Sequence, residues 1–128
     1  MSGGRQRHIM VVDDEPAFRR LVVRMLERGG YRVTHVEDYV SALKLVETDH
    51  TLDLLLLDVG MPAGTPQGIS IAKMSQMRQA LLRIVYMTGG DAQQVAEYAD
   101  SAPVLQKPFT AEELLKTVAS VLAGERGR

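Results

Sequence analysis

The chain has 128 residues, which suits one domain with a substantial core and is short for two. Its 45% hydrophobic and 24% charged residues are those of a globular protein, and a net charge of −1 without a basic run argues against a nucleic-acid-binding surface. It contains no stretch of about 18 apolar residues and no signal-peptide pattern, so we expect no membrane contact. We expect a cytoplasmic location, with which the lack of cysteine is compatible.

We expect the chain to form a single domain with two loose ends. Residues 1–7 read as a disordered or tag-like N-terminus, residues 8–123 as the domain, and residues 124–128 as a loose C-terminus. No internal repeat or low-complexity linker divides the chain, and its three histidines lie too far apart for a histidine-built metal site.

The first half of the chain alternates short apolar runs with segments of helical spacing. Pro16 suits the first turn of a helix, where its missing N–H is not needed, and Gly29-Gly30 is typical of a helix end. The elements expected here are a strand at 8–12, a helix from Pro16 to Gly29-Gly30, a strand at 31–36, a helix at 38–49 and a strand that ends at Asp58.

The second half continues this alternation after a loop rich in glycine and proline. The expected elements are a loop at 59–68, a helix from Ile69 to about Ala80, a strand at 83–87, a short helix from Asp91 through Ala99, a strand at 103–106 and a last helix opened by a capping box of Thr110 with Glu113. We expect Met74 and Met77 to fill the core, and Tyr86 and Tyr98 to pack on the sheet and a helix.

Five strands alternating with five helices predict an α/β fold with a doubly wound parallel sheet, in three flavodoxin-like α/β/α layers. The sequence does not itself show the strand order. Right-handed crossovers and a central third strand favour the order 2-1-3-4-5. In that order the ends of the first and third strands lie side by side at one rim of the sheet, flanked by the ends of the fourth and fifth.

The stretch from Leu52 to Asp58 contains four consecutive leucines, which fit a strand buried on both faces. Its carboxylate at Asp58 stands where the strand should end, and ligands of open α/β sheets bind beyond the carboxyl ends of strands. An aspartate in this place is also an ordinary turn or cap residue. Asp58 becomes a functional candidate because other strand ends are charged as well.

Asp13 and Asp14 follow the first strand, while Thr88 and Lys107 follow the fourth and fifth. Carboxylates that converge at one rim repel one another unless a cation lies among them. Oxygen ligands without histidine or cysteine favour a hard cation, and Mg²⁺ in particular, because it also binds phosphate oxygens. Lys107 supplies a positive charge and Thr88 a hydroxyl donor, so the set suits transfer of a phosphoryl group to Asp58.

Each of these residues also has a purely structural explanation. Asp13 and Asp14 could cap the following helix and favour its positive end. Thr88 could satisfy backbone groups at a strand end. Lys107 could be a solvated loop charge.

The motifs together resemble the receiver domain of bacterial two-component response regulators, and the single-domain, chemotaxis-regulator-like members in particular. The similarity covers about His8 to Ala123. It rests on Asp13-Asp14, Asp58 with Met61-Pro62 after it, Thr88-Gly89, and Lys107-Pro108-Phe109. The resemblance implies that Asp58 accepts a phosphoryl group from a histidine kinase or phosphotransfer protein. It also implies a downstream protein target and no direct contact with nucleic acid.

The resemblance further implies a Mg²⁺ site. Asp13 and Asp58 would bind the metal directly, Asp14 directly or through water, and Gly60 through its backbone carbonyl. Thr88 and Lys107 would bind the phosphoryl oxygens, and the bond between Lys107 and Pro108 would be cis.

The chain departs from the family pattern in several places. Val104 stands where an aromatic residue is common in the fifth strand, and the loop after Asp58 is about two residues longer than usual because of residues 63–67. Gly60 and Gly90 occupy two positions that in the family tune the lifetime of the phosphoryl group. No output domain follows the last helix, so we expect the signal to leave by surface contacts, or the chain to be a piece of a larger regulator.

Two other functions are compatible with parts of this pattern. A Mg²⁺-dependent aspartyl-phosphate phosphatase or mutase would use similar chemistry but needs a second aspartate two residues after the nucleophile, where this chain has Gly60. A receiver-fold scaffold that is never phosphorylated would not be expected to keep the complete set of acids, threonine and lysine. We therefore predict a phosphoacceptor signalling module rather than an enzyme, with only self-catalysed phosphoryl transfer and autodephosphorylation.

Overall fold

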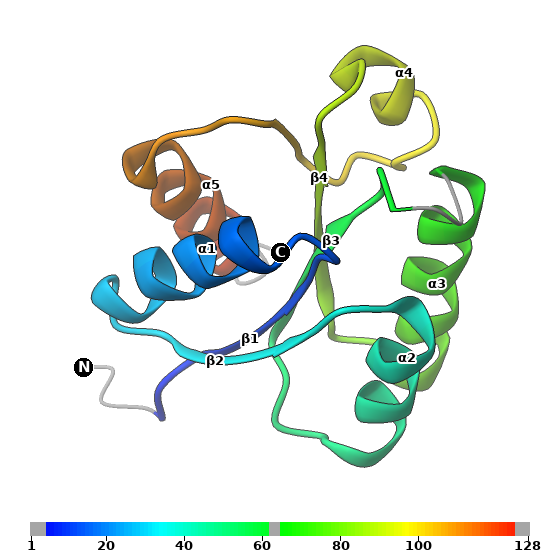
Figure 1. The fold of residues 1–128 in the computed structure, drawn as a ribbon. Helices are drawn as coiled ribbons and strands as arrows, with labels where there is room; N and C mark the ends of the chain where they lie inside the picture. The colour runs from blue at the N-terminus through cyan, green and yellow to red at the C-terminus, as the bar shows by residue number, and fades with distance from the viewer. Residues whose placement is uncertain (1–4, 62–64, 125–128) are drawn as a thin grey trace.

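The computed structural model describes residues 5–61 and 65–124 and has a five-stranded parallel sheet at its centre (Figure 1). Along the chain the elements are β1 (His8–Val12), α1 (Pro16–Arg28), β2 (Arg32–Val36), α2 (Tyr39–Thr48), β3 (Leu54–Asp58), α3 (Thr65–Arg78), β4 (Arg83–Thr88), α4 (Ala92–Ala96), β5 (Val104–Gln106) and α5 (Ala111–Gly124). Among these described helices, none is long and apolar enough to cross a membrane.

The strand order is β2-β1-β3-β4-β5, which confirms the predicted fold. The register aligns the carboxyl ends of the central strands, because Val12 pairs with Leu57 and Asp58 pairs with Met87. Thr88 at the end of β4 pairs with Gln106 at the end of β5. The residues that follow these strands are therefore delivered to one rim of the sheet.

Helices cover both faces of the sheet, α1 and α5 on one face and α2 and α3 on the other (Figure 1). β1, β3 and most of β4 are buried, as expected for parallel strands covered on both sides. β2 at the sheet edge is more exposed. One core, under α2, α3 and α4, includes Leu55 and Leu57; the other, under α1 and α5, includes Leu54 and Leu56. This alternation explains the leucine run, since each face of β3 needs its own apolar side chains.

Helix α3 begins at Thr65, earlier than the start at Ile69 predicted from the sequence, and ends at Arg78 instead of near Ala80. We expected Gly68 to close a loop, but it lies inside the helix. A Cβ atom at Gly68 would come within 2.9 Å of the Tyr39 hydroxyl and of a Val59 methyl, so the glycine permits close packing instead. Of the loop extension predicted at residues 63–67, residues 63 and 64 lie outside the described residues, and residues 65–67 belong to α3.

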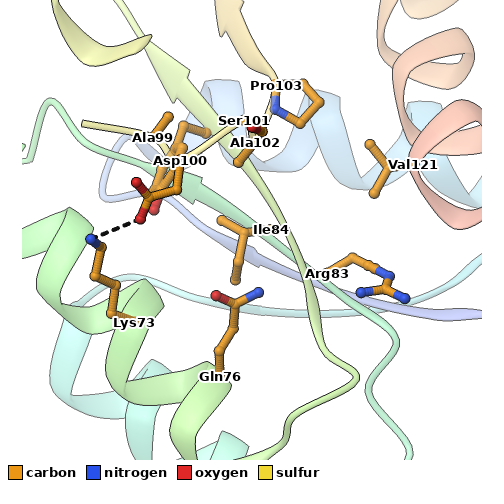
Figure 2. Close-up of a pocket in the computed structure, with 11 residues that line it drawn as sticks. Lys73, Gln76, Arg83, Ile84, Ala99, Asp100, Ser101, Ala102, Pro103 and Val121 are labelled. Carbon is orange, nitrogen blue, oxygen red and sulfur yellow. Dashed lines mark ion pairs between the residues drawn. The ribbon is translucent and has the colours of Figure 1, made fainter. Parts of the chain in front are cut away.

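Helix α4 is also shorter than expected, because it stops at Ala96 and not at Ala99. Asp91 caps it as predicted, accepting a hydrogen bond from the N–H of Gln93 at 2.9 Å. The chain then turns through two residues with left-handed backbone, Asp100 (φ 49°) and Ser101 (φ 75°). An ion pair of 2.9 Å between Asp100 and Lys73 fastens this turn to α3 (Figure 2).

Three of the four packing predictions for large side chains on the helices and sheet were wrong. Met77 is 78% exposed and Met74 37%, because the buried face of α3 is occupied by smaller neighbours such as Ala72 and Ser75. Tyr98 is 59% exposed, since it follows the end of the shortened α4. Tyr86 is buried in β4 as predicted.

The described part of the N-terminal segment, which we expected to be loose, makes several contacts. Arg5 donates two hydrogen bonds of 2.8 Å to the carboxylate of Asp53, just before β3. The same carboxylate accepts the backbone N–H of His8 at 2.8 Å, and the carbonyl of Arg7 accepts the N–H of Arg32 at 2.9 Å. These contacts fix the chain at the foot of the sheet, opposite the functional rim.

His8 is fully buried between two threonines at this foot of the sheet. The Thr51 hydroxyl donates to Asp49 at 2.6 Å, so its oxygen is free to accept from Nδ1 of His8 at 2.8 Å. Nε2 of a neutral ring then accepts from the Thr34 hydroxyl at 2.7 Å. Burial, aided by the charge of Arg32, lowers the pKa of His8, and the nearby acids only partly oppose this.

We predict that His8 makes the free energy of unfolding pH-dependent. Below the ordinary histidine pKa of about 6.5, the unfolded chain takes up a proton that the folded chain resists, so stability should fall as the pH drops from there toward the lowered pKa. Urea unfolding between about pH 7.5 and about pH 5.5 measures this slope. His8→Gln should flatten the slope, whereas the same change at exposed His50 should leave it intact; equal slopes in both variants would contradict the prediction.

Candidate functional site

Three carboxylates gather at the rim where β1 and β3 end. Asp58 is the last residue of β3, and Asp13, held by a hydrogen bond from its N–H to the carbonyl of Val36, follows β1. Asp13 and Asp58 are buried, and Asp14 is exposed. One carboxylate oxygen from each of the three lies within 4.8 Å of the others. The structure thus brings together the acids predicted from the sequence.

Lys107 reaches this group from the end of β5. Its backbone N–H donates to the carbonyl of Thr88 at 2.8 Å, which positions the residue at the rim. Its Nζ lies 2.9 Å from Oδ2 of Asp13 and 3.1 Å from Oδ2 of Asp58. The bond to Pro108 is cis, as the resemblance implied. Lys107 is therefore a partner of both buried acids and not a solvated loop charge.

A pair of packed aromatic rings, Phe18 and Phe109, lies next to Lys107. The ring of Phe18 lies 4.6 Å from Nζ of Lys107, at a distance suited to a cation–π contact. Phe18 in turn packs edge to face on Phe109, with 5.5 Å between ring centroids. The contact was missed from the sequence, because nothing in the helical spacing shows that the ring of Phe18 reaches Lys107.

Thr88 stands beside the ion-paired group at the end of β4. It is buried, and its Oγ1 accepts a hydrogen bond of 3.0 Å from the N–H of Gly90. Together with Gly60 it lines a hollow of about 590 Å³ that extends toward α4. The hydroxyl is therefore placed at the rim and connected through Gly90 to the segment that leads into α4.

The backbone after Asp58 holds its carboxylate in place. The N–H of Gly60 donates to Oδ1 of Asp58 at 2.7 Å, which leaves Oδ2 facing Lys107. The Tyr39 hydroxyl donates to the carbonyl of Asp58 at 2.9 Å. Tyr39 was missed from the sequence, since a tyrosine in the first turn of an amphipathic helix carries no signal for such a contact. The predicted role of the Gly60 carbonyl as a metal ligand stays a prediction.

A second missed contact lies behind Asp13. Arg19, on α1, donates to the carbonyl of Asp13 at 2.8 Å and to Nδ1 of His35 at 3.2 Å. The N–H of Glu15 donates to Oδ1 of Asp13 at 2.9 Å. The bond from Arg19 holds the backbone of Asp13, and the bond from Glu15 orients its carboxylate. No local pattern in the sequence indicates these contacts of Arg19.

The pKa values of the site reflect burial and crowding of charge. Burial raises the pKa of Asp58, and the negative charge of Asp13 adds to this, while the N–H of Gly60 and the charge of Lys107 oppose it only in part. Burial alone would lower the pKa of Lys107, but its hydrogen bond to Asp13 and the charges of both buried acids outweigh burial and raise it. Lys107 is therefore charged at neutral pH.

The donor set fits a hard divalent cation. The described side chains of this cluster are three carboxylates and one lysine, so part of the negative charge is not neutralised. All candidate ligands are oxygen atoms, which Mg²⁺ and Ca²⁺ prefer, and Asp14 stands open to solvent, where water can complete a metal's shell.

Comparison with known proteins agrees with this geometry. A protein-family model described as the response regulator receiver domain matches residues 9–119. The response regulator receiver protein CpdR of Brucella abortus is 31% identical over 119 residues, which cover 91% of this chain and 97% of that protein. The response regulator MprA of Mycobacterium ulcerans is 35% identical over 117 residues, 89% of this chain and 49% of that protein. The chain thus spans nearly all of one relative and about half of the other.

Solved structures share the fold. A receiver domain protein described as CheY-like, from Methanospirillum hungatei, superposes with a TM-score of 0.85 at 20% identity, covering 96% of this chain and 98% of that one. A response regulator protein of Burkholderia pseudomallei, crystallised with a phosphorylated aspartic acid, a calcium ion and citrate, has a TM-score of 0.79 at 26% identity, covering 95% and 72%. The chain belongs to the response regulator receiver domain family of two-component signalling proteins.

Proposed function

We propose that this receiver domain accepts a phosphoryl group on Asp58 from a histidine kinase or a phosphotransfer protein. In this proposal Asp13, Asp14, Asp58 and the Gly60 carbonyl hold Mg²⁺. The observation that best supports it is the position of Nζ of Lys107, within 3.1 Å of both Asp13 and Asp58 at the rim where Asp14 also lies. The Burkholderia pseudomallei response regulator protein, crystallised with a phosphorylated aspartic acid and a calcium ion, also supports the proposal.

The transfer would form one bond and break one. An oxygen of the Asp58 carboxylate bonds to phosphorus as the bond from phosphorus to the donor's imidazole nitrogen breaks, and the imidazole leaves. Bound Mg²⁺ supplies charge neutralisation for the phosphoryl oxygens. Gly60 keeps Oδ1 of Asp58 oriented through its N–H, while Lys107, already 3.1 Å from Oδ2, is in place to contact a phosphoryl oxygen there.

The output would pass through protein contacts. The chain carries 15 basic and 16 acidic residues without a basic run, so a protein target suits it better than nucleic acid. A cytoplasmic location is part of this proposal, and the absence of cysteine is compatible with it.

Acetyl phosphate with Mg²⁺, followed by intact mass measurement, tests the proposal. A stable gain of one phosphoryl group per chain is expected. Rapid turnover of many phosphomonoesters would instead indicate the phosphatase or mutase, and no gain at all would indicate an unphosphorylated scaffold. A phosphatase or mutase of this kind needs a general acid two residues after the nucleophile. Gly60 stands there and offers only a backbone N–H, so we expect no phosphomonoester turnover.

We predict that the phosphorylated state is read out mainly around α4. A phosphoryl group adds about two negative charges and three acceptor oxygens. If the Thr88 hydroxyl turns toward the phosphoryl group, the N–H of Gly90 loses the acceptor to which it now donates at 3.0 Å. An aromatic residue at position 104 could turn inward and fill the space that Thr88 would leave. Val104 is partly buried, stiff at χ1 and too short to fill this space. The change should therefore pass to α4 rather than along β5.

Amide shifts on adding beryllofluoride, a phosphoryl mimic, measure this route. They should concentrate in residues 88–99, and Thr88→Ala should shrink them while mimic binding persists. Dominant distal shifts in α1 and α2, with residues 88–99 silent, would contradict the route.

A further inference from the structure

A hollow between the beginning of α3 and α4 lies next to the candidate site. Its volume is about 590 Å³, within the range of roughly 300–1,000 Å³ typical of binding pockets. Its lining includes Gly60 and Thr88, which belong to the candidate site, and the apolar side chains of Ile69 and Val95. Ile69 and Val95 are themselves buried in the core, so this lining is firmly supported. We call this hollow the α3–α4 groove.

The mouth of the α3–α4 groove is acidic. Residues 88–106 contain three acids, Asp91, Glu97 and Asp100, and no lysine or arginine, although the whole chain is nearly balanced in charge. Asp100 is already paired with Lys73 at 2.9 Å, whereas Asp91 and Glu97 line the groove. Asp91 uses Oδ1 to cap α4, and both residues are exposed. An occupant of the groove therefore meets negative charge on the α4 side.

Tyr98 stands at the edge of the same groove with 59% of its surface exposed. Tyrosine combines a large apolar ring with a hydroxyl and is enriched among the residues that dominate binding energy at protein interfaces. Its exposed position follows from the early end of α4, since the chain turns away before Tyr98 can pack. An apolar floor, an aromatic edge and two acids thus occupy one small surface.

We propose that the α3–α4 groove is a docking site for a basic segment of a partner protein. An apolar side chain of that segment enters the groove against Ile69 and Val95 and packs beside Tyr98. Lysine or arginine residues next to it meet Asp91 and Glu97. The charge pattern selects this occupant, because an acidic segment would be repelled and a purely apolar one would leave both carboxylates without a partner.

The groove also connects its occupant to the site at the sheet rim, and this step rests on the proposed function. Thr88 and Gly60 belong to both, so a change in the position of Thr88 alters the lining of the groove. A phosphoryl group on Asp58 adds negative charge beside a groove that attracts basic residues. Phosphorylation should therefore strengthen binding of the segment, and by reciprocity the segment should strengthen retention of the phosphoryl mimic.

A phage-displayed library of random peptides, selected against the full chain, provides the probe. We expect enriched peptides to share an apolar residue with neighbouring lysine or arginine. Affinity for the best peptide should fall about tenfold or more in Glu97→Lys and in Tyr98→Ala, since loss of an interface anchor typically has an effect of that size. Both positions are exposed, so the variants should keep the wild-type unfolding transition. Glu112→Lys on α5 and Val40→Ala on α2, also exposed, are the matched controls and should bind normally.

The proposal is overturned if no peptide is enriched over an unrelated control protein, if the enriched peptides are acidic, or if they bind Glu97→Lys and Tyr98→Ala as tightly as wild type. Peptide-induced amide shifts that spare the groove lining (Gly60, Ile69 and residues 88–98) would overturn it as well. Self-association that is lost in Tyr98→Ala would replace the foreign partner with a second copy of this chain.

Peptide binding with and without beryllofluoride distinguishes a failure of the connection between groove and site from a failure of the proposed phosphoacceptor function. We expect it to raise peptide affinity by about fivefold or more, the lower end of typical couplings between sites. Unchanged affinity in a protein that acetyl phosphate labels at Asp58 would overturn the connection and leave the phosphoacceptor function standing. Peptide binding without any labelling of Asp58 would contradict the phosphoacceptor function and leave the docking site standing.

Discussion

Asp58→Asn is expected to reduce phosphoryl uptake from acetyl phosphate to background while the fold stays intact. The amide has nearly the same shape as the carboxylate but lacks the nucleophilic anion. Its oxygen can still accept the N–H of Gly60, which is now 2.7 Å from Oδ1, and Lys107 keeps its contact with Asp13 at 2.9 Å. Removing one of three crowded acids also relieves repulsion, so the variant should unfold at the same or a higher temperature than wild type.

Asp53→Asn is the matched control for this experiment, because Asp53 precedes the same strand at its opposite end. It is largely buried and is paired with Arg5. We expect it to weaken the contacts at the foot of the sheet and lower stability, yet to leave uptake unchanged. Equal loss of uptake in both variants would mean that any buried charge near β3 matters and that Asp58 has no special role. Undiminished labelling of Asp58→Asn at another residue would contradict the assignment directly.

Asp13→Asn is expected to weaken Mg²⁺ binding and phosphoryl uptake together, by more than about tenfold. Even residues that only support metal ligands typically contribute 10- to 100-fold. Asp13 is fully buried, and its two carboxylate oxygens are held by the N–H of Glu15 and by Nζ of Lys107. We therefore expect that the exposed side chain of Asp14 cannot take its place by changing rotamer. Charge neutralisation of the transferring oxygens would be lost with the metal.

Amide shifts during a Mg²⁺ titration measure the metal site apart from the chemistry. In the wild type they should appear at Asp13, Asp14 and Gly60, and in Asp13→Asn they should require far more Mg²⁺. Asp38→Asn offers a control, since Asp38 is an exposed acid that caps α2 and asparagine caps equally well. A wild type whose site amides do not respond to Mg²⁺ would rule out the metal site.

The sequence was most informative where physical chemistry leaves few choices. A run of four leucines fits a strand buried on both sides, and right-handed crossovers then favour an order that places the ends of β1 and β3 together. The positions of Asp13 and Asp58 at one rim follow from this. Asp91 and the box of Thr110 with Glu113 cap their helices as predicted, because caps depend on neighbours in the sequence.

The sequence was least informative where distant side chains decide the outcome. The start of α3 depended on whether Gly68 lies in a loop or packs against Tyr39, which helical spacing alone does not show. Exposure of Met77 depended on which face of α3 meets the sheet. The contact of Lys107 with Phe18 joins the two ends of the chain, and no local pattern encodes it.

Localisation of the phosphoryl group in the wild-type chain tests the central claim most directly. After incubation with Mg²⁺ and acetyl phosphate, the acyl phosphate is trapped by reduction and the chain is digested and sequenced by mass spectrometry. We predict one modified residue, Asp58, and no modification when Mg²⁺ is removed by a chelator. A phosphoryl group on any other residue, or full labelling of Asp58 without a divalent metal, would contradict this account.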